Sequence, residues 1–272
     1  MRLLALLATV AALAGATGAA AKTTVPPILF PVVGAVTYYD DFGEPRGALR
    51  HQGNDLLGTK RMPVVAVEPG TVKYWTTSAS AGCMLYLYGA SGTMYEYIHL
   101  NNDLTAANDN RGTCVQGVAY AVPDGAHVDA GQAIGYLGDS GDANGLHPHL
   151  HFEVHPNAGK AVDPYPFLRK APHPLLAAPA AGVGFTLRLS GTVVSTGTTT
   201  LTLVVDTLTS WPSHLKELKL NRKLTLAVPD PATVAAQTGD RVIAWTVLAP
   251  ATLQTLTGAP GALSLDRLLP AP

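Results

Sequence analysis

Short apolar runs, each closed by glycine or another turn residue, are the feature that most restricts the fold of this chain. Between residues 28 and 170 these runs are four to seven residues long and rich in β-branched and aromatic residues, as in Val64–Val67 and Leu150–Val154. Runs of this length are typical of strands, and turn signals such as Pro123–Gly125 separate them. No amphipathic helix of useful length interrupts the pattern. The sequence therefore predicts a mainly β protein with an antiparallel β domain over residues 28–170.

A second region, residues 183–272, is dominated by Thr, Leu, Val and Ala. Apolar and polar residues alternate in it, as in Phe185–Leu189 and Leu201–Val205, which is the period of a half-buried strand. We predict a smaller all-β barrel or sandwich of about five strands, with an OB-like barrel as one alternative. The Pro- and Ala-rich stretch 171–182 is interpreted as a linker. The second region contains no cluster of titratable or aromatic groups, so its role is not predicted.

The first 21 residues have the order of a secretory signal peptide. Arg2 precedes the apolar run Leu3–Leu13, and small residues ending in Ala19–Ala21 follow. The run is shorter than the roughly 20 residues that span a bilayer, and no later window is longer. We expect residues 1–21 to be removed and the mature protein to have no membrane span. It would then be secreted, periplasmic or associated with the cell wall.

The charge balance argues against nucleic acid as a partner. Lys and Arg number 18 against 19 Asp and Glu, and charged residues make up only 14% of the chain. A nucleic-acid-binding surface needs an excess of basic residues. Nucleic-acid binding is therefore disfavoured.

Cys83 and Cys114 are the two cysteines of the sequence. Export would place them in a compartment where disulfides persist, so we expect them to form a bridge. Two buried free thiols are the alternative, because a sequence does not show whether the two Cα atoms approach each other.

Histidines are concentrated in the first region, where seven of the nine lie between positions 51 and 155. Alternate residues of a strand share a face, so His149 and His151 would point one way while Leu150 and Phe152 point toward a core. Cα atoms two residues apart on a strand are about 6.6 Å from each other. One imidazole could then ligate a metal while its neighbour reaches the metal's water.

His51 and Asp55 form the second pattern. Extended residues four apart lie about 13 Å from each other, so the two side chains share an ion only if the chain bends, which Gly53 permits. Two imidazoles and one carboxylate suit a catalytic zinc with an open water position. Each pattern alone is weak, but their occurrence in one β domain indicates metal-assisted hydrolysis.

Other polar residues near these patterns have ordinary interpretations. Glu153 shares the strand face of His151 and either supports an imidazole or lines a groove. His155 is expected to face solvent. Tyr95 and Tyr97 would share a strand face with His99, so either could line the groove, although core packing is the default.

Five blocks of the sequence follow one another in a recognisable order and spacing. They are Arg50–Leu56, Pro63–Val72, Tyr97–Leu100, Asp129–Gly135 and His149–Glu153. Together they closely resemble the lysostaphin-type, or LytM-like, zinc endopeptidases. The resemblance covers about residues 28–170 and leaves the C-terminal region outside it.

This resemblance implies an antiparallel β-sheet domain with an open groove. It assigns His51, Asp55 and His151 as zinc ligands, and it places His99 and His149 beside the zinc's water, where they orient or deprotonate it and stabilise the oxyanion. Because all five positions are intact, the family's non-catalytic branch is disfavoured. The family cleaves peptide cross-links or stems of bacterial peptidoglycan, so the implied function is an exported zinc endopeptidase acting on peptidoglycan peptides.

Two alternative functions stay open. One is a non-catalytic module that binds the wall or activates another hydrolase, and the other is a zinc peptidase acting on secreted proteins. The segment 101–127, which carries Cys114, is longer than in compact family members and is expected to form a groove wall or lid. The tract 141–148 is also long. Because loops set substrate preference, glycyl-glycine specificity is not assumed.

Overall fold

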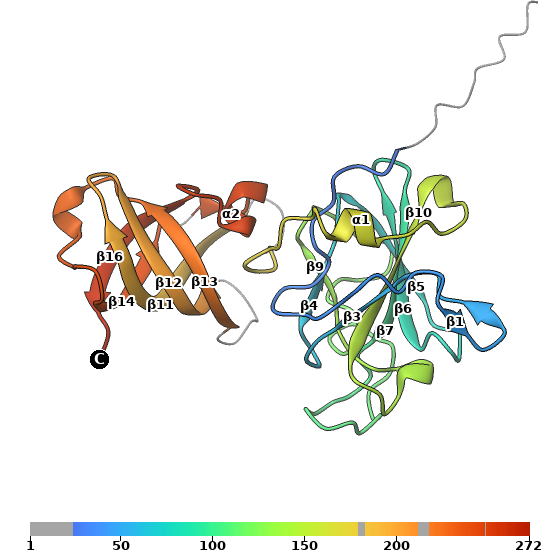
Figure 1. The fold of residues 1–272 in the computed structure, drawn as a ribbon. Coiled ribbons are helices and arrows are strands. Elements are labelled where there is room, and N and C mark those ends of the chain that lie inside the picture. Colours follow the sequence, from blue (N-terminus) through green and yellow to red (C-terminus); the bar gives the residue numbers. More distant parts are fainter. Residues whose placement is uncertain (1–23, 179–182, 212–217, 248) are drawn as a thin grey trace, which may run out of the picture.

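The computed structural model describes residues 24–178, 183–211, 218–247 and 249–272. The predicted signal peptide, residues 1–21, lies outside the described residues. Two six-stranded sheets dominate the described part of the chain, one in each half of the sequence (Figure 1). The predicted mainly β class is therefore confirmed.

The first sheet is antiparallel, with strand order β3-β10-β7-β6-β5-β8. Its strands are β3 (Asn54–Leu57), β5 (Gly70–Trp75), β6 (Cys83–Gly89), β7 (Met94–Leu100), β8 (His127–Val128) and β10 (His149–His155). Two short pairs accompany it, β1 (Pro45–Arg46) with β2 (Leu49–Arg50) and β4 (Pro63–Val65) with β9 (Ala133–Tyr136). Because β10 lies between β3 and β7, residues distant in sequence meet on neighbouring strands.

Strand β10 shows why this sheet has one core face and one open face. Leu150, Phe152 and Val154 are fully buried, and the Phe152 ring stacks with that of Tyr95 at a centroid distance of 5.9 Å. His149 and His151 alternate with them on the opposite face, as the period of two predicts. The core therefore fixes the direction in which both histidines point.

Helices in this half are short. They are η1 (Gly141–Ala143), η2 (Pro156–Ala158) and α1 (Tyr165–Leu168). Within the ranges that the structure describes, no helix is long and apolar enough to cross a bilayer.

The second sheet closes into a barrel. Its strands are β11 (Gly184–Thr196), β12 (Thr200–Trp211), β13 (Leu218–Ala227), β14 (Arg241–Thr246), β15 (Ala249–Pro250) and β16 (Leu263–Pro270), accompanied by η3 (Pro231–Thr233) and α2 (Leu253–Thr257). The order β12-β13-β16-β14-β11 returns to β12, because β11 also pairs with β12. Strands β13 and β16 are parallel and the other pairs are antiparallel. Of the predicted alternatives, the structure contains the five-stranded OB-like barrel.

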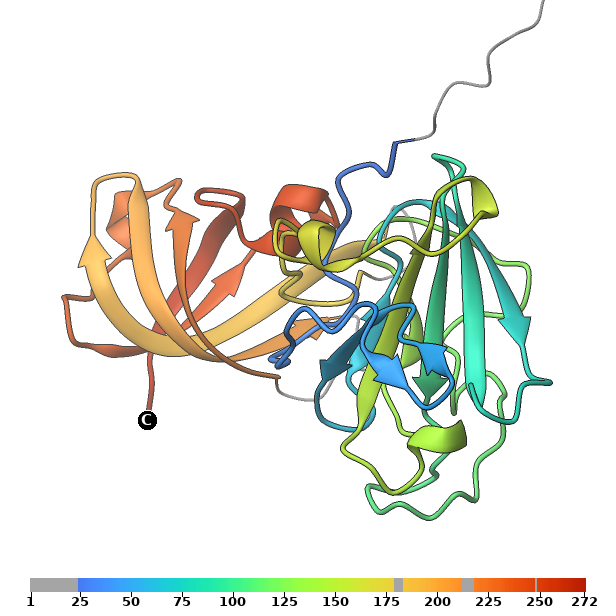
Figure 2. The same ribbon diagram turned by 45° about the vertical axis from the view of Figure 1, so that its right-hand side comes forward.

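The two halves touch through the stretch interpreted as a linker. Leu175 and Leu176 are buried in the apolar core of the barrel. On the other side, the Ala178 amide donates a hydrogen bond of 2.8 Å to the carbonyl of Gly131, which precedes β9. Figure 2 shows the barrel lying beside the first sheet across this stretch. The limits 28–170, 171–182 and 183–272 stay a prediction, but the described part of the stretch is packed.

The predicted disulfide is present. Cys83 at the start of β6 is bonded to Cys114, and their Cα atoms are 5.1 Å apart. The bridge anchors the long segment 101–127 to the sheet. Side-chain amides of Asn108 and Asn110 donate to Asn144 Oδ1 at 2.8 and 3.1 Å, so this segment also leans on the tract 141–148.

Removing the bridge is expected to lower stability without changing the fold. The two cysteines are 31 residues apart, and opening a loop of that size costs about 3–4 kcal/mol of unfolding free energy. Urea unfolding of the Cys83→Ser, Cys114→Ser variant at pH 7 should show this loss. Reductant should destabilise the parent protein to the same level and leave the variant unchanged. Equal stability of variant and oxidised parent would contradict the prediction.

Candidate functional site

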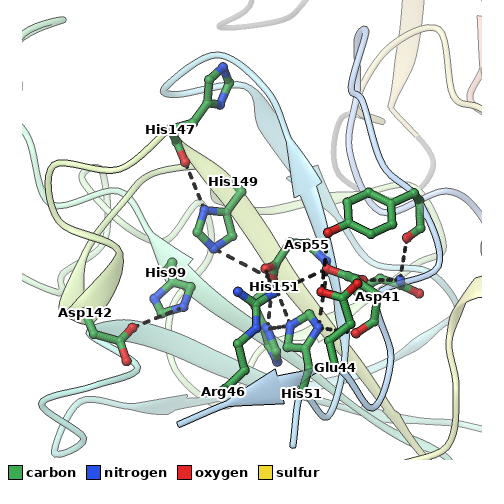
Figure 3. Close-up of polar contacts among 12 residues, drawn as sticks. Asp41, Glu44, Arg46, His51, Asp55, His99, Asp142, His147, His149 and His151 are labelled. Atoms are coloured by element: carbon green, nitrogen blue, oxygen red, sulfur yellow. Dashed lines mark hydrogen bonds and ion pairs between the residues drawn. The ribbon is translucent and has the colours of Figure 1, made fainter.

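A cleft of about 700 Å³ opens on the face of β10 that points away from the core. Arg46 and Leu49 on the β1–β2 hairpin and Asp142 in η1 line this cleft. Figure 3 shows Asp142 beside His99 and Arg46 beside Asp55. All five site residues predicted from the sequence line this cleft. They are His51, Asp55, His99, His149 and His151.

Three of these side chains converge on one point. Asp55 on β3 lies directly opposite His151 on β10 in the strand register. His151 Nδ1 lies 3.0 Å from Asp55 Oδ1 and 2.9 Å from His51 Nε2, and the third side of this triangle, His51 Nε2 to Asp55 Oδ1, is 3.1 Å. Two strands and the segment just before β3 therefore build the cluster.

The bend between His51 and Asp55 has a different basis from the one expected. The chain is extended only from Asn54 onward, so the distance of a fully extended segment does not apply. A Cβ atom on Gly53 would lie 2.5 Å from the Phe152 carbonyl oxygen, which real Cβ atoms do not approach. Gly53 is therefore required by the close approach of its backbone to β10.

The donor set fits a zinc ion. Two imidazole nitrogens and one carboxylate oxygen are typical zinc ligands, with bonds of about 2.0–2.2 Å. Three donors that lie about 3 Å from one another can all reach one common point at that bond length. His51, Asp55 and His151 are thus a group that could hold a metal, and they leave one side open to the cleft.

Four imidazole rings in the cleft each have one nitrogen within hydrogen-bond distance of a carbonyl or carboxylate oxygen of the protein. Because carbonyl and carboxylate oxygens only accept, the contacting nitrogen must donate, and this sets the tautomer of a neutral ring. In a neutral ring, the form that ligates a metal, the other nitrogen carries its lone pair toward the cleft, whereas a protonated His151 donates from both nitrogens, to Glu153 and to Asp55. The donating atoms and acceptors are His51 Nδ1 to Asp41 O at 2.9 Å, His99 Nδ1 to Ser140 O at 2.9 Å, His149 Nδ1 to His147 O at 3.0 Å, and His151 Nε2 to Glu153 Oε1 at 2.9 Å.

His99 and His149 lie beside the three-residue cluster. Their ring centroids are 5.0 Å apart, and His149 Nε2 is 3.8 Å from Asp55 Oδ1. Burial lowers the pKa of His99 to about 4, assisted by the neighbouring rings of His149 and His151. His99 is therefore neutral at pH 7, with Nε2 able to accept a proton or a hydrogen bond.

A distortion of β7 turns His99 into the cleft. His99 has a φ of +61°, which is uncommon for a residue other than glycine, and the register between β6 and β7 shifts between Cys83 and Leu85. Strict alternation would put His99 on the face of Tyr95 and Tyr97. Both tyrosines are fully buried instead, so the default of core packing is correct and neither lines the cleft. Strained backbone of this kind is frequent at functional sites.

Arg46 is a site residue that the sequence patterns did not reveal. Its guanidinium donates to Asp55 Oδ2 at 2.9 Å, leaving Oδ1 to the histidines. Burial alone would raise the pKa of Asp55, but hydrogen bonds from His151 and His51 outweigh burial and hold that pKa well below its usual range. The spacing of Arg46 carries no signal of this contact, which arises because the β1–β2 hairpin folds back over the cleft.

The histidines outside the cluster divide into exposed and buried. His127 and His147 are exposed. The expectation that His155 faces solvent is wrong, because only 7% of it is exposed. It continues the strand face of His151 and Glu153, where it contacts Glu153, Glu96 and the backbone carbonyl of Gly159. Glu153 fulfils both of its predicted roles, since it accepts a hydrogen bond from His151 and also lines the cleft.

A β domain that gathers two imidazoles and a carboxylate in an open cleft has the architecture of a hydrolytic metal site. Residues 49–164 match the model of peptidase family M23. This part of the chain is therefore a peptidase M23 domain, and the family resemblance seen in the sequence is confirmed. The matched range includes all five site residues.

Similar proteins are known by sequence and by structure. The chain is 27% identical over 150 residues to the L-Ala–D-Glu endopeptidase of Bacillus subtilis (strain 168), a match that spans 51% of this chain and 41% of that relative. The catalytic domain of the antimicrobial peptidase lysostaphin from Staphylococcus simulans is 27% identical, with a TM-score of 0.40, over 49% of this chain and 92% of that one. A zinc-containing peptidase from Vibrio cholerae is 24% identical, with a TM-score of 0.39, over 55% of this chain and 41% of that one.

The cluster predicts a pH-dependent stability for the metal-free protein. Burial lowers the pKa of His151, but hydrogen bonds to Asp55 and Glu153 outweigh it and raise the pKa to about 9. A group whose pKa is raised by folding stabilises the fold below its unfolded pKa of about 6.5, and this contribution is lost as the pH rises through 9. Urea unfolding of chelator-treated protein between pH 6.5 and 9 should show the loss.

The His151→Gln variant is the control for this experiment. Its unfolding free energy should vary less over the same pH range, because glutamine does not titrate. A parent protein whose pH dependence equals that of the variant would contradict the assignment.

Proposed function

We propose that this chain is an exported zinc-dependent endopeptidase that hydrolyses peptide bonds of bacterial peptidoglycan. The observation that carries the proposal is the convergence of His51, Asp55 and His151 within an open cleft of the M23 domain, with donor atoms 2.9–3.1 Å apart. The relative from Bacillus subtilis is named for cleavage next to a D-amino acid, and peptides of that kind occur in peptidoglycan.

His51, Asp55 and His151 would hold the zinc ion. When bound, zinc polarises a substrate carbonyl and lowers the pKa of water to about 7, which makes hydroxide available at neutral pH. The backbone carbonyl of Asp41 and the carboxylate of Glu153 keep the two ligand rings in the orientation that presents their lone pairs.

His149 and His99 supply the proton chemistry in this proposal. Each has Nδ1 committed to a backbone carbonyl, so Nε2 is the atom that accepts a proton from the attacking water. Once protonated at Nε2, a ring can donate a hydrogen bond to the carbonyl oxygen as that oxygen gains negative charge. It can then return the proton to the leaving amine.

The cleft walls suit an extended peptide. Leu49 on the hairpin and Leu146 in the tract 141–148 line the cleft and are 71% and 62% exposed. These exposed apolar side chains can contact the side chains of a bound peptide, and Arg46 and Asp142 add charged groups to the same lining.

The activity is tested with purified protein and defined muropeptides. We expect new amino groups and shorter peptides in the mass spectrum, loss of the reaction on adding a zinc chelator, and recovery on adding zinc. Absence of cleavage would favour the non-catalytic wall-binding or activating module. Cleavage of extracellular proteins but not of muropeptides would favour a peptidase acting on secreted proteins.

Two variants separate zinc binding from proton transfer. His151→Ala should lose both zinc and activity, whereas His149→Ala should keep zinc and lose activity by about 10²-fold or more. His127→Ala is the matched control, because His127 is exposed and lies outside the cleft, and it should retain both. Activity in a zinc-free His151→Ala protein would overturn the proposal.

Export is proposed from the first 21 residues and can be checked separately. Expression in a bacterial host with an intact secretion system should yield an exported chain that begins at Lys22. N-terminal sequencing of the exported protein measures this. A chain that stays in the cytoplasm with Met1 in place would contradict it.

A further inference from the structure

A charged cluster adjoins the candidate metal site, and two of its three members, Glu96 and His155, have no part in the chemistry proposed above. It consists of Glu96 on β7 and of Glu153 and His155 on β10, and we call it the lower cluster. Glu153 and Glu96 are directly opposite each other in the antiparallel register of the two strands. Their side chains are 9% and 16% exposed. Like charges in such a position repel each other, and partial burial strengthens the repulsion.

His155 lies where it can relieve this repulsion. Its Nε2 is 2.7 Å from Glu153 Oε2 and 3.4 Å from Glu96 Oε1. Its Nδ1 is 2.8 Å from the carbonyl oxygen of Gly159, an atom that only accepts hydrogen bonds. Both ring nitrogens therefore donate, and a ring with two donors is a cation.

Glu153 connects the lower cluster to the zinc ligands. Its Oε1 accepts the hydrogen bond from His151 Nε2 at 2.9 Å, and its Oε2 accepts the hydrogen bond from His155. The two contacts hold the carboxylate from opposite ends. A rotated carboxylate would break its contact with His151, and the ring of His151 would lose the acceptor that presents Nδ1 to Asp55 and His51.

We propose that His155 is a positioning residue that acts as a fixed cation: it holds Glu153 against Glu96, and through Glu153 it orients the zinc ligand His151. The site needs a positive charge at position 155, and it does not need histidine chemistry there. This inference rests on the proposed function for the identity of the metal. It assigns a role to His155, which lies outside the lining of the cleft.

Burial and hydrogen bonding agree with this assignment. Burial lowers the pKa of His155, but the hydrogen bonds to Glu153 and to the Gly159 carbonyl outweigh it, and the net shift is upward.

A metal ion held by Glu96, Glu153 and His155 is the competing interpretation, because their ligand atoms lie within 4.8 Å of one another. The two interpretations predict different zinc stoichiometries.

The test compares variants by zinc affinity, measured with zinc alone in competition with a chelator. His155→Gln keeps the size and polarity of the side chain but removes the charge, and it should weaken zinc binding by about 10–100-fold. It should also lower kcat with little change in KM. His155→Arg restores the cation and should bind zinc within about threefold of the parent protein. His127→Gln, at the exposed first position of β8, is the matched control and should behave as the parent.

A double-mutant cycle distinguishes positioning from general destabilisation. Glu153→Gln alone should weaken zinc binding to a similar degree, and adding His155→Gln to it should have little further effect, because His155 acts through Glu153. Additive losses would overturn the proposal. If His155→Gln does not fold, as shown by urea unfolding, the comparison of His155→Arg with the parent protein still decides it: a folded arginine variant with strongly weakened zinc binding contradicts the fixed-cation role.

The outcomes separate this inference from the proposed function. A parent protein that binds no zinc contradicts the proposed function. A parent protein that binds one zinc, with His155→Gln binding it equally well, contradicts only the inference. Two zinc ions per chain in the parent, with one lost in His155→Gln, would show that the lower cluster is a second metal site and would overturn the fixed-cation role.

Discussion

The pairing of β3 with β10 is the constraint on which the candidate site depends. It places Asp55 opposite His151, and the core side chains of β10 prevent the strand from turning over. His51 enters the same cluster because it lies three residues before the start of β3. A one-residue slip between the two strands would send both the histidines and the apolar side chains to the wrong face. The hydrophobic core thus fixes the register of β3 and β10. The cluster of His51, Asp55 and His151 forms on strands whose positions this core already determines.

The second constraint is the set of oxygen acceptors behind the rings. A histidine free to rotate presents either nitrogen, and a metal would have to order it on binding. Here Asp41, Ser140, His147 and Glu153 each commit one ring nitrogen, so the entropy of orienting the rings is already lost on folding. The acceptors must themselves be held in place by further residues. Glu153, for example, lies opposite Glu96, and the repulsion between these two carboxylates must be offset if Glu153 is to keep its contact with His151.

Much of the site could be predicted from the sequence, because its strongest signals are local. The alternation of β10 correctly separates His149 and His151 from Leu150 and Phe152, and the barrel strands follow the same rule. His99 escaped the rule because a positive φ and a register shift reversed its direction. Arg46 was missed because its partner Asp55 lies on another strand, and no spacing along the chain reports such a contact. His155 was expected in solvent because its burial beside Glu96 depends on the pairing of β10 with β7, which the sequence pattern does not reveal. The roles of the five cleft residues remain proposals.

The absence of a side chain at position 53 determines how closely the segment before β3 approaches β10. At Gly53 the backbone of one segment lies so close to β10 that an added carbon would meet the Phe152 carbonyl at 2.5 Å and the His151 ring nitrogen at 2.8 Å. Even alanine would push the two segments apart by several tenths of an ångström. Metal–ligand bonds vary by only about 0.2 Å. A methyl group at position 53 would therefore be enough to move the three ligand atoms out of reach of one common metal ion.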